Sequence, residues 1–373
     1  MIQKSLVVKM AALLAATAIA WNPARACTAV DIVASDGTVI AGRTMEWSSE
    51  MGWTLVALPR GTALKLTAPA STGLPPVEAR TRHAVLGVGV GIIPGNPLLE
   101  GQNSAGLSMS GNFLPGFTQY QAVGPKDGSY VSILGFGAWA LGSHASVAEL
   151  KAALSRTRVW GDSSILPAGS APPTLHFVFV DRTGAGMVVE YVKGELQIHD
   201  NVAHVLTNAP TYDWHLLNLR NYLNLSTVGK MEERLGEVDV TALGQGGGMV
   251  GIPGDYTPPS RFVHTAFLRH HVPRPADGDR AIQVIGHILN DVDIPAGIAQ
   301  SKLPDGTLAS DFTQFVVIKD LTRNRMLVAD AAHRLTYLTL DLDRIFAQAA
   351  PATVRIADLP YPKAIDGTQA LLR

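Results

Sequence analysis

A single cysteine, Cys27, occurs in this chain of 373 residues, and it directly follows a segment that looks like an export signal. Exported proteins that use cysteine structurally tend to carry even numbers joined in disulfides, so this chain must fold around its core instead. Its residues are 47% hydrophobic, enough for a sizeable core, and its 36 glycines and 23 prolines indicate many turns and much β-structure. A lone cysteine in an oxidising compartment is a reactive thiol, so Cys27 is the first candidate for chemistry.

Residues 1–26 have the parts of a secretory signal. Lys4 and Lys9 give a positive start, residues 10–20 form an apolar stretch too short to span a bilayer, and an A-x-A cleavage site ends at Ala26. An uncleaved anchor or a buried helix is the alternative. No later segment approaches about 18 uninterrupted apolar residues, so no membrane span is expected. We therefore expect signal peptidase to remove this segment.

Two other readings of Cys27 compete with a reactive thiol: an inert buried residue, or the acylation site of a lipoprotein. The first position of a processed chain is an unusual place for an inert cysteine. Lipoprotein signals usually carry a leucine-like residue three positions before the cysteine and a small residue two before it. This chain has Ala24 and Arg25 there, which argues against lipidation.

A cysteine at the first position of a chain carries a base on its own backbone. The α-amino group has a pKa of ~7.7–8.0, so it can accept the thiol proton near neutral pH. This is the logic of N-terminal nucleophile hydrolases. Such a site also requires a cation near the sulfur, an acceptor that orients the amine, and donors aimed at the developing oxyanion.

Hydrophobic periodicity predicts an α+β fold with mostly antiparallel strand pairing. Residues 27–34 and 38–44 should form a hairpin that returns Arg43 towards Cys27. Further strands are expected at 53–58, 84–92, 107–113, 175–181, 186–192, 195–199, 312–319, 325–330 and 335–340. Helices are expected at 131–142, 146–156, 214–223 and 279–291, with a capping-box pattern at Ser146. No long polar linker or internal repeat occurs, so residues 27–373 are expected to form a single domain.

The segment GRTMEW supplies two candidate site residues. Arg43 is a permanent cation that can hold the sulfur as a thiolate, and Glu46 can accept hydrogen bonds from the α-amine. A surface ion pair is the alternative for these two residues. Asn208 ends an apolar strand, where its amide can donate to an oxyanion or simply form a turn.

Two later segments add further candidates. Asn112 has a strand-to-loop setting like that of Asn208. Residues 246–262 form a Gly/Pro-rich loop that contains Arg261 near its end, and its glycines let the backbone bend around a site.

Several function classes are excluded. The formal net charge of −1 makes nucleic acid or an anionic membrane an unexpected partner. The histidines between residues 264 and 271 lack a cysteine or carboxylate cluster at ligand spacing, so no metal is expected. The chain has no G-K-[ST] phosphate loop, HExxH or G-x-S-x-G motif.

Taken together, four ordered segments resemble the choloylglycine hydrolase family, which includes bile salt hydrolases and penicillin V acylases. They are CTAVDIVASDGTVIAGRTMEW, NSAGLSMSGNF, LTNAPTYDWHLLNLRNY and GIPGDYTPPSRF. The resemblance runs from Cys27 to about residue 342. It implies a four-layer αββα sandwich, cysteine-dependent amide hydrolysis without a metal or organic cofactor, and a homotetramer. With the export signal, it implies a soluble protein of the Gram-negative, periplasmic branch.

By position, the resemblance assigns Cys27 as the nucleophile and Arg43 as the arginine beside it. It assigns Asn208, in the LTN motif, as the oxyanion-hole asparagine, and Arg261 as the arginine that supports the nucleophile. In the uncleaved chain the nitrogen of Cys27 is an amide without useful basicity, so we expect the precursor to be inactive.

Two positions depart from the family pattern. Asn112 matches a second asparagine, but one residue is missing between Gly111 and Asn112 relative to the familiar spacing. Glu46 stands where aspartate is common, and its longer side chain can still accept the hydrogen bond of the amine.

The expected substrate is a small amide with an apolar acyl group. Penicillin V and acyl-homoserine lactones are the first candidates, and conjugated bile salts, which need a wider pocket, are the second. Plausible pocket residues, each alternatively an ordinary core residue, are Trp47, Met51, Trp53 and Phe113. A non-catalytic periplasmic lipoprotein or binding module is the alternative from another class.

Overall fold

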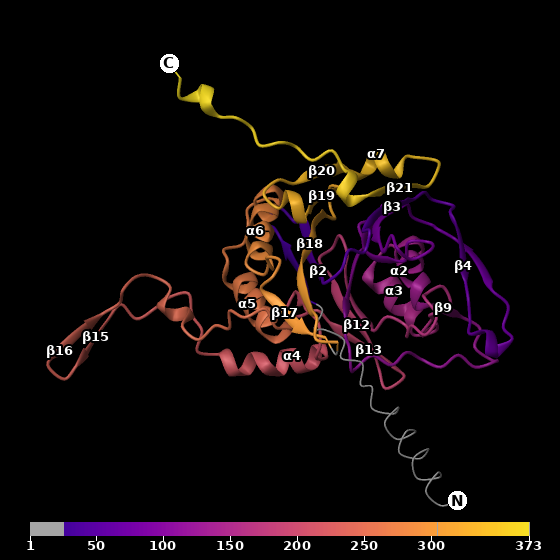
Figure 1. Ribbon diagram of the computed structural model, residues 1–373, viewed down its shortest axis with the longest axis horizontal. Helices are drawn as coiled ribbons and strands as arrows, with labels where there is room; N and C mark the ends of the chain where they lie inside the picture. The colour runs from indigo at the N-terminus through magenta and orange to yellow at the C-terminus, as the bar shows by residue number, and fades with distance from the viewer. Residues whose placement is uncertain (1–25, 304, 373) are drawn as a thin grey trace, which may run out of the picture.

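Two β-sheets pack face to face, and helices cover the outer face of each (Figure 1). The computed structural model describes residues 26–303 and 305–372, so the expected signal peptide, apart from Ala26, lies outside the described residues. The layers follow the order helix, sheet, sheet, helix. This confirms the expected α+β class and the αββα sandwich.

The first sheet has the strand order β14-β1-β2-β18-β19-β20, and β17 also pairs with β18. Every neighbouring pair is antiparallel. Its strands are β14 (Val205–Leu206), β1 (Cys27–Val33), β2 (Val39–Trp47), β18 (Leu308–Asp320), β19 (Arg325–Asp330), β20 (Leu338–Asp341) and β17 (Ala299–Lys302). Its outer face is covered by α5 (Pro258–His271) and α6 (Gly278–Asn290).

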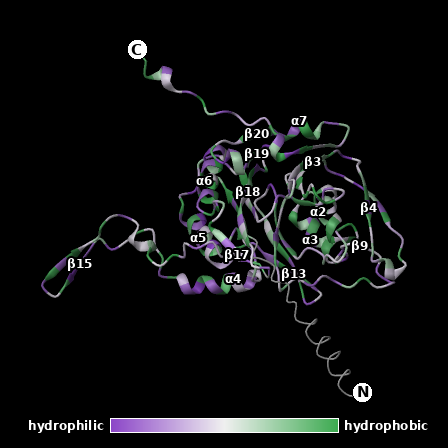
Figure 2. Ribbon diagram, viewed as in Figure 1, coloured by the Kyte–Doolittle hydropathy of each residue, from purple (hydrophilic) through white to green (hydrophobic). Residues whose placement is uncertain are grey.

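The second sheet has the strand order β13-β12-β11-β8-β7-β6-β3-β21. Its strands are β13 (Glu195–Asp200), β12 (Gly186–Val192), β11 (Leu175–Val180), β8 (Ser108–Phe113), β7 (Leu98–Asn103), β6 (Val85–Gly89), β3 (Thr54–Leu58) and β21 (Ala352–Arg355). Helix α2 (Ile133–Ser143) packs mainly on β7, and α3 (Val147–Leu154) follows it in the chain. Figure 2 shows that hydrophobic residues predominate in α2, as its burial requires.

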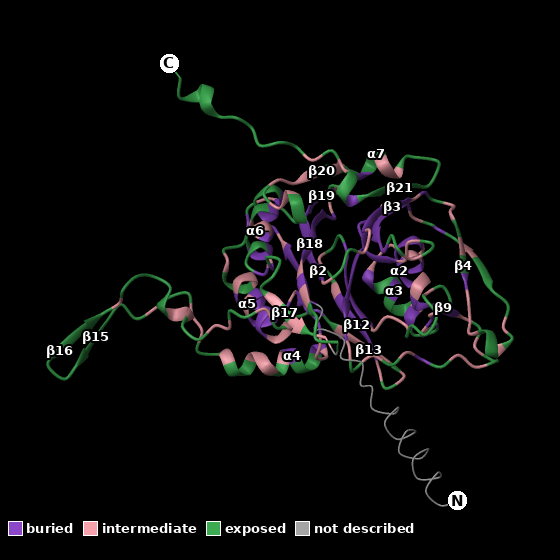
Figure 3. Cartoon of the chain, in the orientation of Figure 1, coloured by how far each residue is buried: buried purple, intermediate pink, exposed green. Residues whose placement is uncertain are grey.

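Shorter elements complete the described chain. The three small two-stranded ladders are β4 (Ala63–Leu66) with β5 (Val77–Arg80), β9 (Tyr130–Ser132) with β10 (Arg158–Trp160), and β15 (Glu232–Leu235) with β16 (Val238–Thr241). The short helices are α4 (Tyr212–Asn218), α7 (Leu342–Phe346), η1 (Ala70–Thr72), η2 (Leu219–Tyr222), η3 (Gly247–Met249), η4 (Ala331–His333), η5 (Ile356–Asp358) and η6 (Thr368–Ala370). The β15–β16 ladder projects from the body and is exposed along its whole length (Figures 1 and 3).

The hairpin formed by β1 and β2 turns at Gly37, whose φ of 86° favours glycine. Its register pairs Cys27 with Met45 and Ala29 with Arg43. Because directly opposite residues of an antiparallel pair share a face, Cys27 and Arg43 project into the same layer, between the two sheets. The register therefore confirms that the hairpin returns Arg43 to Cys27.

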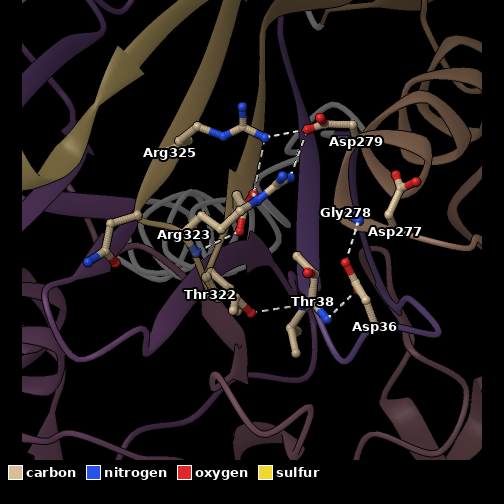
Figure 4. A network of polar contacts seen from close by, with 12 residues as sticks. Asp36, Thr38, Asp277, Gly278, Asp279, Thr322, Arg323 and Arg325 are labelled. Atoms are coloured by element: carbon tan, nitrogen blue, oxygen red, sulfur yellow. Dashed lines mark hydrogen bonds and ion pairs between the residues drawn. The ribbon is translucent and has the colours of Figure 1, made fainter.

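The turn end of this hairpin is tied to α6 and to the β18–β19 turn (Figure 4). The carboxylate of Asp36 accepts the Gly278 N–H at 3.3 Å, at the start of α6. In the same helical turn, Asp279 lies 2.9 Å from Arg323 and 2.6 Å from Arg325. The Val39 N–H also donates to Oγ1 of Thr322 at 3.0 Å, so the end of the hairpin opposite Cys27 is anchored to both α6 and the β18–β19 turn.

Several expectations about the elements needed correction. The loop expected at 246–262 ends early, because α5 begins at Pro258 with two prolines in its first turn, where their missing N–H groups are not needed. The helix expected at 214–223 is α4 followed by the 3-10 turn η2. The Ser146 cap is confirmed, since its hydroxyl accepts the Glu149 N–H at 3.2 Å. Within residues 26–303 and 305–372, no helix is both long and apolar enough to cross a membrane.

Candidate active site

Cys27 opens β1 and is fully buried between the two sheets. Its Sγ lies 3.3 Å from Nη2 of Arg43 and 3.6 Å from Sδ of Met45. Burial raises the pKa of the Cys27 thiol above its ordinary value, the positive charge of Arg43 lowers it, and the carboxylate of Glu46 raises it. Burial is the largest of these effects, so forming the thiolate requires both the cation and a base nearby.

The guanidinium of Arg43 is held by backbone carbonyls of the second sheet. Its Nη1 donates to the Leu99 carbonyl at 3.1 Å, and its Nη2 donates to the Gly111 carbonyl at 2.8 Å. A planar guanidinium with several donors can satisfy both carbonyls and still direct an N–H at the sulfur. Arg43 thus spans the two sheets and presents a fixed positive charge to Cys27.

Asn208 and Arg261 meet at the backbone of Cys27. The nitrogen of Cys27 lies 2.6 Å from Oδ1 of Asn208, which also accepts Nη2–H of Arg261 at 2.9 Å. Nη1 of Arg261 donates to the Cys27 carbonyl at 2.6 Å and to Oγ1 of Thr28 at 2.5 Å. The amide nitrogen of Asn208 donates to the Phe113 carbonyl at 3.0 Å. Asn208 therefore orients the nitrogen of Cys27, and Arg261 holds both the strand end and the asparagine.

Glu46 does not accept the hydrogen bond of the Cys27 nitrogen, which the sequence led us to expect. Successive strand residues project to opposite faces, so Glu46 points to the helix side of β2 while Arg43 points between the sheets. Its Oε1 accepts the hydroxyl of Thr313 at 2.9 Å. Burial raises the pKa of Glu46 to about 7, although the charge of Arg261 opposes this shift. The acceptor for the Cys27 nitrogen is Asn208 instead.

Asn112 donates its amide hydrogens to the segment that precedes Asn208. Its Nδ2 donates to the carbonyls of Leu206 at 3.1 Å and Thr207 at 2.8 Å, which uses both amide hydrogens. Its cross-strand neighbour His176 contacts the same Thr207 carbonyl through Nε2 at 3.0 Å. In this arrangement Asn112 braces the segment that leads to Asn208 and has no hydrogen left for an oxyanion.

An apolar cavity of about 550 Å³ lies between the second sheet and the loops around it. All four residues expected to line an acyl pocket line it: Trp47, Met51, Trp53 and Phe113. The rings of Trp47 and Phe113 lie 4.6 Å apart. Cys27 and Arg43 do not line this cavity, but Leu99 and Phe113 do, and their carbonyls accept hydrogen bonds from Arg43 and Asn208.

The histidines between 264 and 271 have other environments. Nε2 of His264 lies 3.0 Å from Asp291, and the ring of His271 stacks on Phe267 at 4.1 Å. In the described part of the chain, no group of three or more His, Cys, Asp or Glu side chains is placed to hold a metal ion.

Sequence reasoning missed two charged residues close to this site. Glu100 and Lys319 are fully buried, and Glu100 lies 3.6 Å from Arg43. The available signal was a single charged residue beside a run of apolar strand residues, in LLEG and in FVVIK. Such a residue must find a partner when it is buried, although the sequence does not identify that partner.

Comparison with known proteins agrees with this geometry. The sequence profile of the family described as "Linear amide C-N hydrolases, choloylglycine hydrolase family" matches residues 27–341. A bile salt hydrolase/transferase of Clostridium perfringens is 33% identical over 291 residues, covering 78% of this chain and 84% of that protein. A bile salt hydrolase/transferase of Bifidobacterium longum is 32% identical, covering 75% and 84%.

Two solved structures have the same fold. The conjugated bile acid hydrolase of Clostridium perfringens superposes with a TM-score of 0.77 and 28% identity, covering 91% of this chain and 99% of that chain. Penicillin V acylase from Agrobacterium tumefaciens has a TM-score of 0.69 and 20% identity, covering 88% and 91%. The matched profile and the similar bacterial enzymes establish that the chain belongs to the choloylglycine hydrolase family of linear amide C–N hydrolases.

Proposed function

We propose that this protein hydrolyses linear amides with an apolar acyl group, with the Cys27 thiol as nucleophile once residues 1–26 have been removed. The observation that supports this most is the guanidinium of Arg43 at 3.3 Å from the sulfur of the chain's sole cysteine. An apolar cavity of about 550 Å³ is lined by Leu99, whose carbonyl accepts a hydrogen bond from Arg43. We further propose that signal peptidase performs the cut during export and that the processed enzyme works in the periplasm.

Removal of residue 26 turns the nitrogen of Cys27 from an amide into an amine that can take the thiol proton. Asn208 already holds this nitrogen at 2.6 Å, so the base is oriented before substrate binds. The thiolate attacks the amide carbonyl carbon and forms a C–S bond. The α-ammonium then gives its proton to the leaving amine as the C–N bond breaks.

Water completes the reaction. The α-amine takes a proton from the water, which attacks the thioester and releases the acid, and the thiol is restored. Nδ2 of Asn208 has one contact among the described residues, the Phe113 carbonyl, so its second hydrogen can serve the oxyanion together with backbone N–H groups. We propose that Asn112 supports this step by bracing residues 206 and 207, rather than as an oxyanion donor.

Penicillin V and acyl-homoserine lactones remain the first substrate candidates, because aromatic rings line the cavity and can stack on a phenoxy group or cover an acyl chain. Conjugated bile salts are the second candidate. The similarity of this chain to bile salt hydrolases, at 32–33% identity, supports conjugated bile salts as substrates.

The test incubates purified protein that begins at Cys27 with penicillin V, an acyl-homoserine lactone or glycocholate. HPLC then measures the free acid that is released from each substrate. A Cys27→Ala variant is the matched control. Hydrolysis of at least one substrate by the wild type alone would support the proposal. Equal hydrolysis by the Cys27→Ala variant, or by protein that retains residues 1–26, would remove the proposed nucleophile or the proposed base.

A further inference from the structure

Two fully buried charges, Glu100 and Lys319, lie behind Arg43 and have no part in the reaction proposed above. Lys319 belongs to β18 of the first sheet and Glu100 to β7 of the second. Nζ of Lys319 contacts Oε1 of Glu100, and Oε2 of Glu100 lies 3.6 Å from Nη1 of Arg43. The three side chains therefore form a continuous line of alternating charge that ends at the Cys27 sulfur.

The strand register explains why the two cations meet one carboxylate. Arg43 pairs with Val317 of β18, so Lys319, two residues further along, projects from the same face of the sheet. Glu100 enters from the facing sheet and contacts both. Nζ of Lys319 also donates to the Met109 carbonyl and to Oγ of Ser110, each at 3.3 Å. These contacts hold the ammonium in place.

The charges of this cluster balance only when the thiol is ionised. Arg43 and Lys319 contribute two positive charges and Glu100 one negative charge, which leaves one buried positive charge uncompensated. An uncompensated buried charge is costly, and a thiolate at Cys27 compensates this one. We propose that Glu100 and Lys319 are positioning residues that stabilise the Cys27 thiolate through Arg43, with Lys319 preventing Glu100 from cancelling the charge of Arg43.

Other buried ionisable groups act on the thiol electrostatically from the helix side of the first sheet. Glu46 lies on the helix side of β2 and Arg261 on α5, and the charges of Asp311 and Asp255 act on Arg261. Burial lowers the pKa of Lys319 below its ordinary value, and the contact with Glu100 opposes only part of this shift. Changes at Glu100 and Lys319 leave the groups around Arg261 in place, so their effect on the thiol can be measured separately.

The test measures the rate constant for iodoacetamide alkylation of Cys27 between pH 5 and pH 10, with processed protein. In Lys319→Met, Arg43 and Glu100 already balance, so the thiolate becomes an excess negative charge. We expect alkylation at pH 7 to slow by about threefold to tenfold and the profile to move to higher pH. The double variant Glu100→Gln/Lys319→Met restores one cation facing the thiolate, and we expect it to return to within about twofold of the wild type.

A purely structural role makes a different prediction. It lowers the melting temperature in the single and double variants and leaves the alkylation profile of the folded protein unchanged. A Lys319→Met profile that superimposes on the wild type, or a double variant as slow as Lys319→Met, would overturn the proposal. If Lys319→Met does not fold, the single variant Glu100→Gln decides. It should alkylate no more slowly than wild type, and slower alkylation refutes the charge argument.

This inference rests on the proposed role of Cys27 as the nucleophile, yet its test needs no substrate. If the variants alkylate as expected but the protein hydrolyses none of the candidate amides, the proposed role of the charge cluster stands and only the proposed function is refuted. If the protein hydrolyses an amide but the variants alkylate like the wild type, the proposed function stands and the role of the charge cluster is refuted.

Discussion

Replacing Arg43 with methionine removes the cation nearest to the Cys27 sulfur and keeps most of the side-chain volume. Two unit charges 3.3 Å apart attract by about 5 kcal/mol at an effective dielectric constant of ~20. Glu100, 3.6 Å from the same guanidinium, opposes part of this effect. We therefore expect the thiolate to lose about 2–4 kcal/mol of stabilisation, which corresponds to a ~30- to ~1,000-fold slower alkylation at pH 7.

The assay is the alkylation rate of Cys27 across pH, read by intact mass, together with kcat/KM for the best amide substrate. Arg43→Lys is the matched control, because it keeps the charge. A compact ammonium cannot reach the Leu99 and Gly111 carbonyls and the sulfur at once, so we expect an intermediate loss of about tenfold. Arg43→Met also leaves these two buried carbonyls without their donor, at about 1–3 kcal/mol each in stability, which thermal unfolding measures separately.

The reasoning fails if folded Arg43→Met protein alkylates within about threefold of the wild type at every pH. That result would mean that the α-amine alone supplies the thiolate. A loss of hydrolysis with unchanged alkylation would instead place Arg43 in substrate positioning.

Three further predictions concern other parts of the molecule. The pKa of Glu46 is raised from 4.5 to about 7, and a raised carboxyl pKa gives stability that is full below the unfolded value and lost as pH rises through the folded value. Between pH 4 and pH 8, the Glu46→Gln variant should therefore lose about 3 kcal/mol less unfolding free energy than the wild type, as measured by urea titration. An equal loss in the two proteins would contradict the assignment. Asn112→Ser should lower kcat by about tenfold with little change in KM, because the segment before Asn208 loses its brace; steady-state kinetics with an unchanged kcat would exclude that role. The exposed ladder within residues 226–248 closes at its base through a 2.9 Å hydrogen bond between Ser226 and Gly248, so the ladder can be deleted there. If copies of the chain associate through this ladder, we expect the deletion to lower the mass of the assembly measured by light scattering. An unchanged mass would exclude this contact.

Much of the local structure around the nucleophile follows from the sequence. The turn at 35–37 and the alternating residues on either side specify a hairpin, and the hairpin alone brings Arg43 to Cys27. The same period of two also separates Arg43 from Glu46, three residues later, onto opposite faces of one strand. Sequence reasoning gave Arg43 a role at the sulfur and Glu46 a role at the α-amine, and the alternation places only Arg43 on the face that carries the sulfur.

The remaining contacts depend on how distant segments pack. Asn208 and Arg261 reach Cys27 across 181 and 234 residues of chain. Local patterns left a turn as the alternative for Asn208, and it was the resemblance to a family that assigned both residues to the site. Arg261 lies on a helix that the sequence reading missed, since two prolines suggested a loop where they instead occupy the first helical turn.

What the sequence by itself determined is the hairpin with its cysteine and arginine, the mixed α+β composition and the family. What only the tertiary structure decided is which charges share the space between the sheets: Arg43 and Lys319 from one sheet, Glu100 from the other. The physical reason is the distance along the chain over which each interaction acts. Turn chemistry and strand alternation act over a few residues and can be read along the chain. The pairing of buried charges depends on the register of two sheets packed against each other, which no local segment contains.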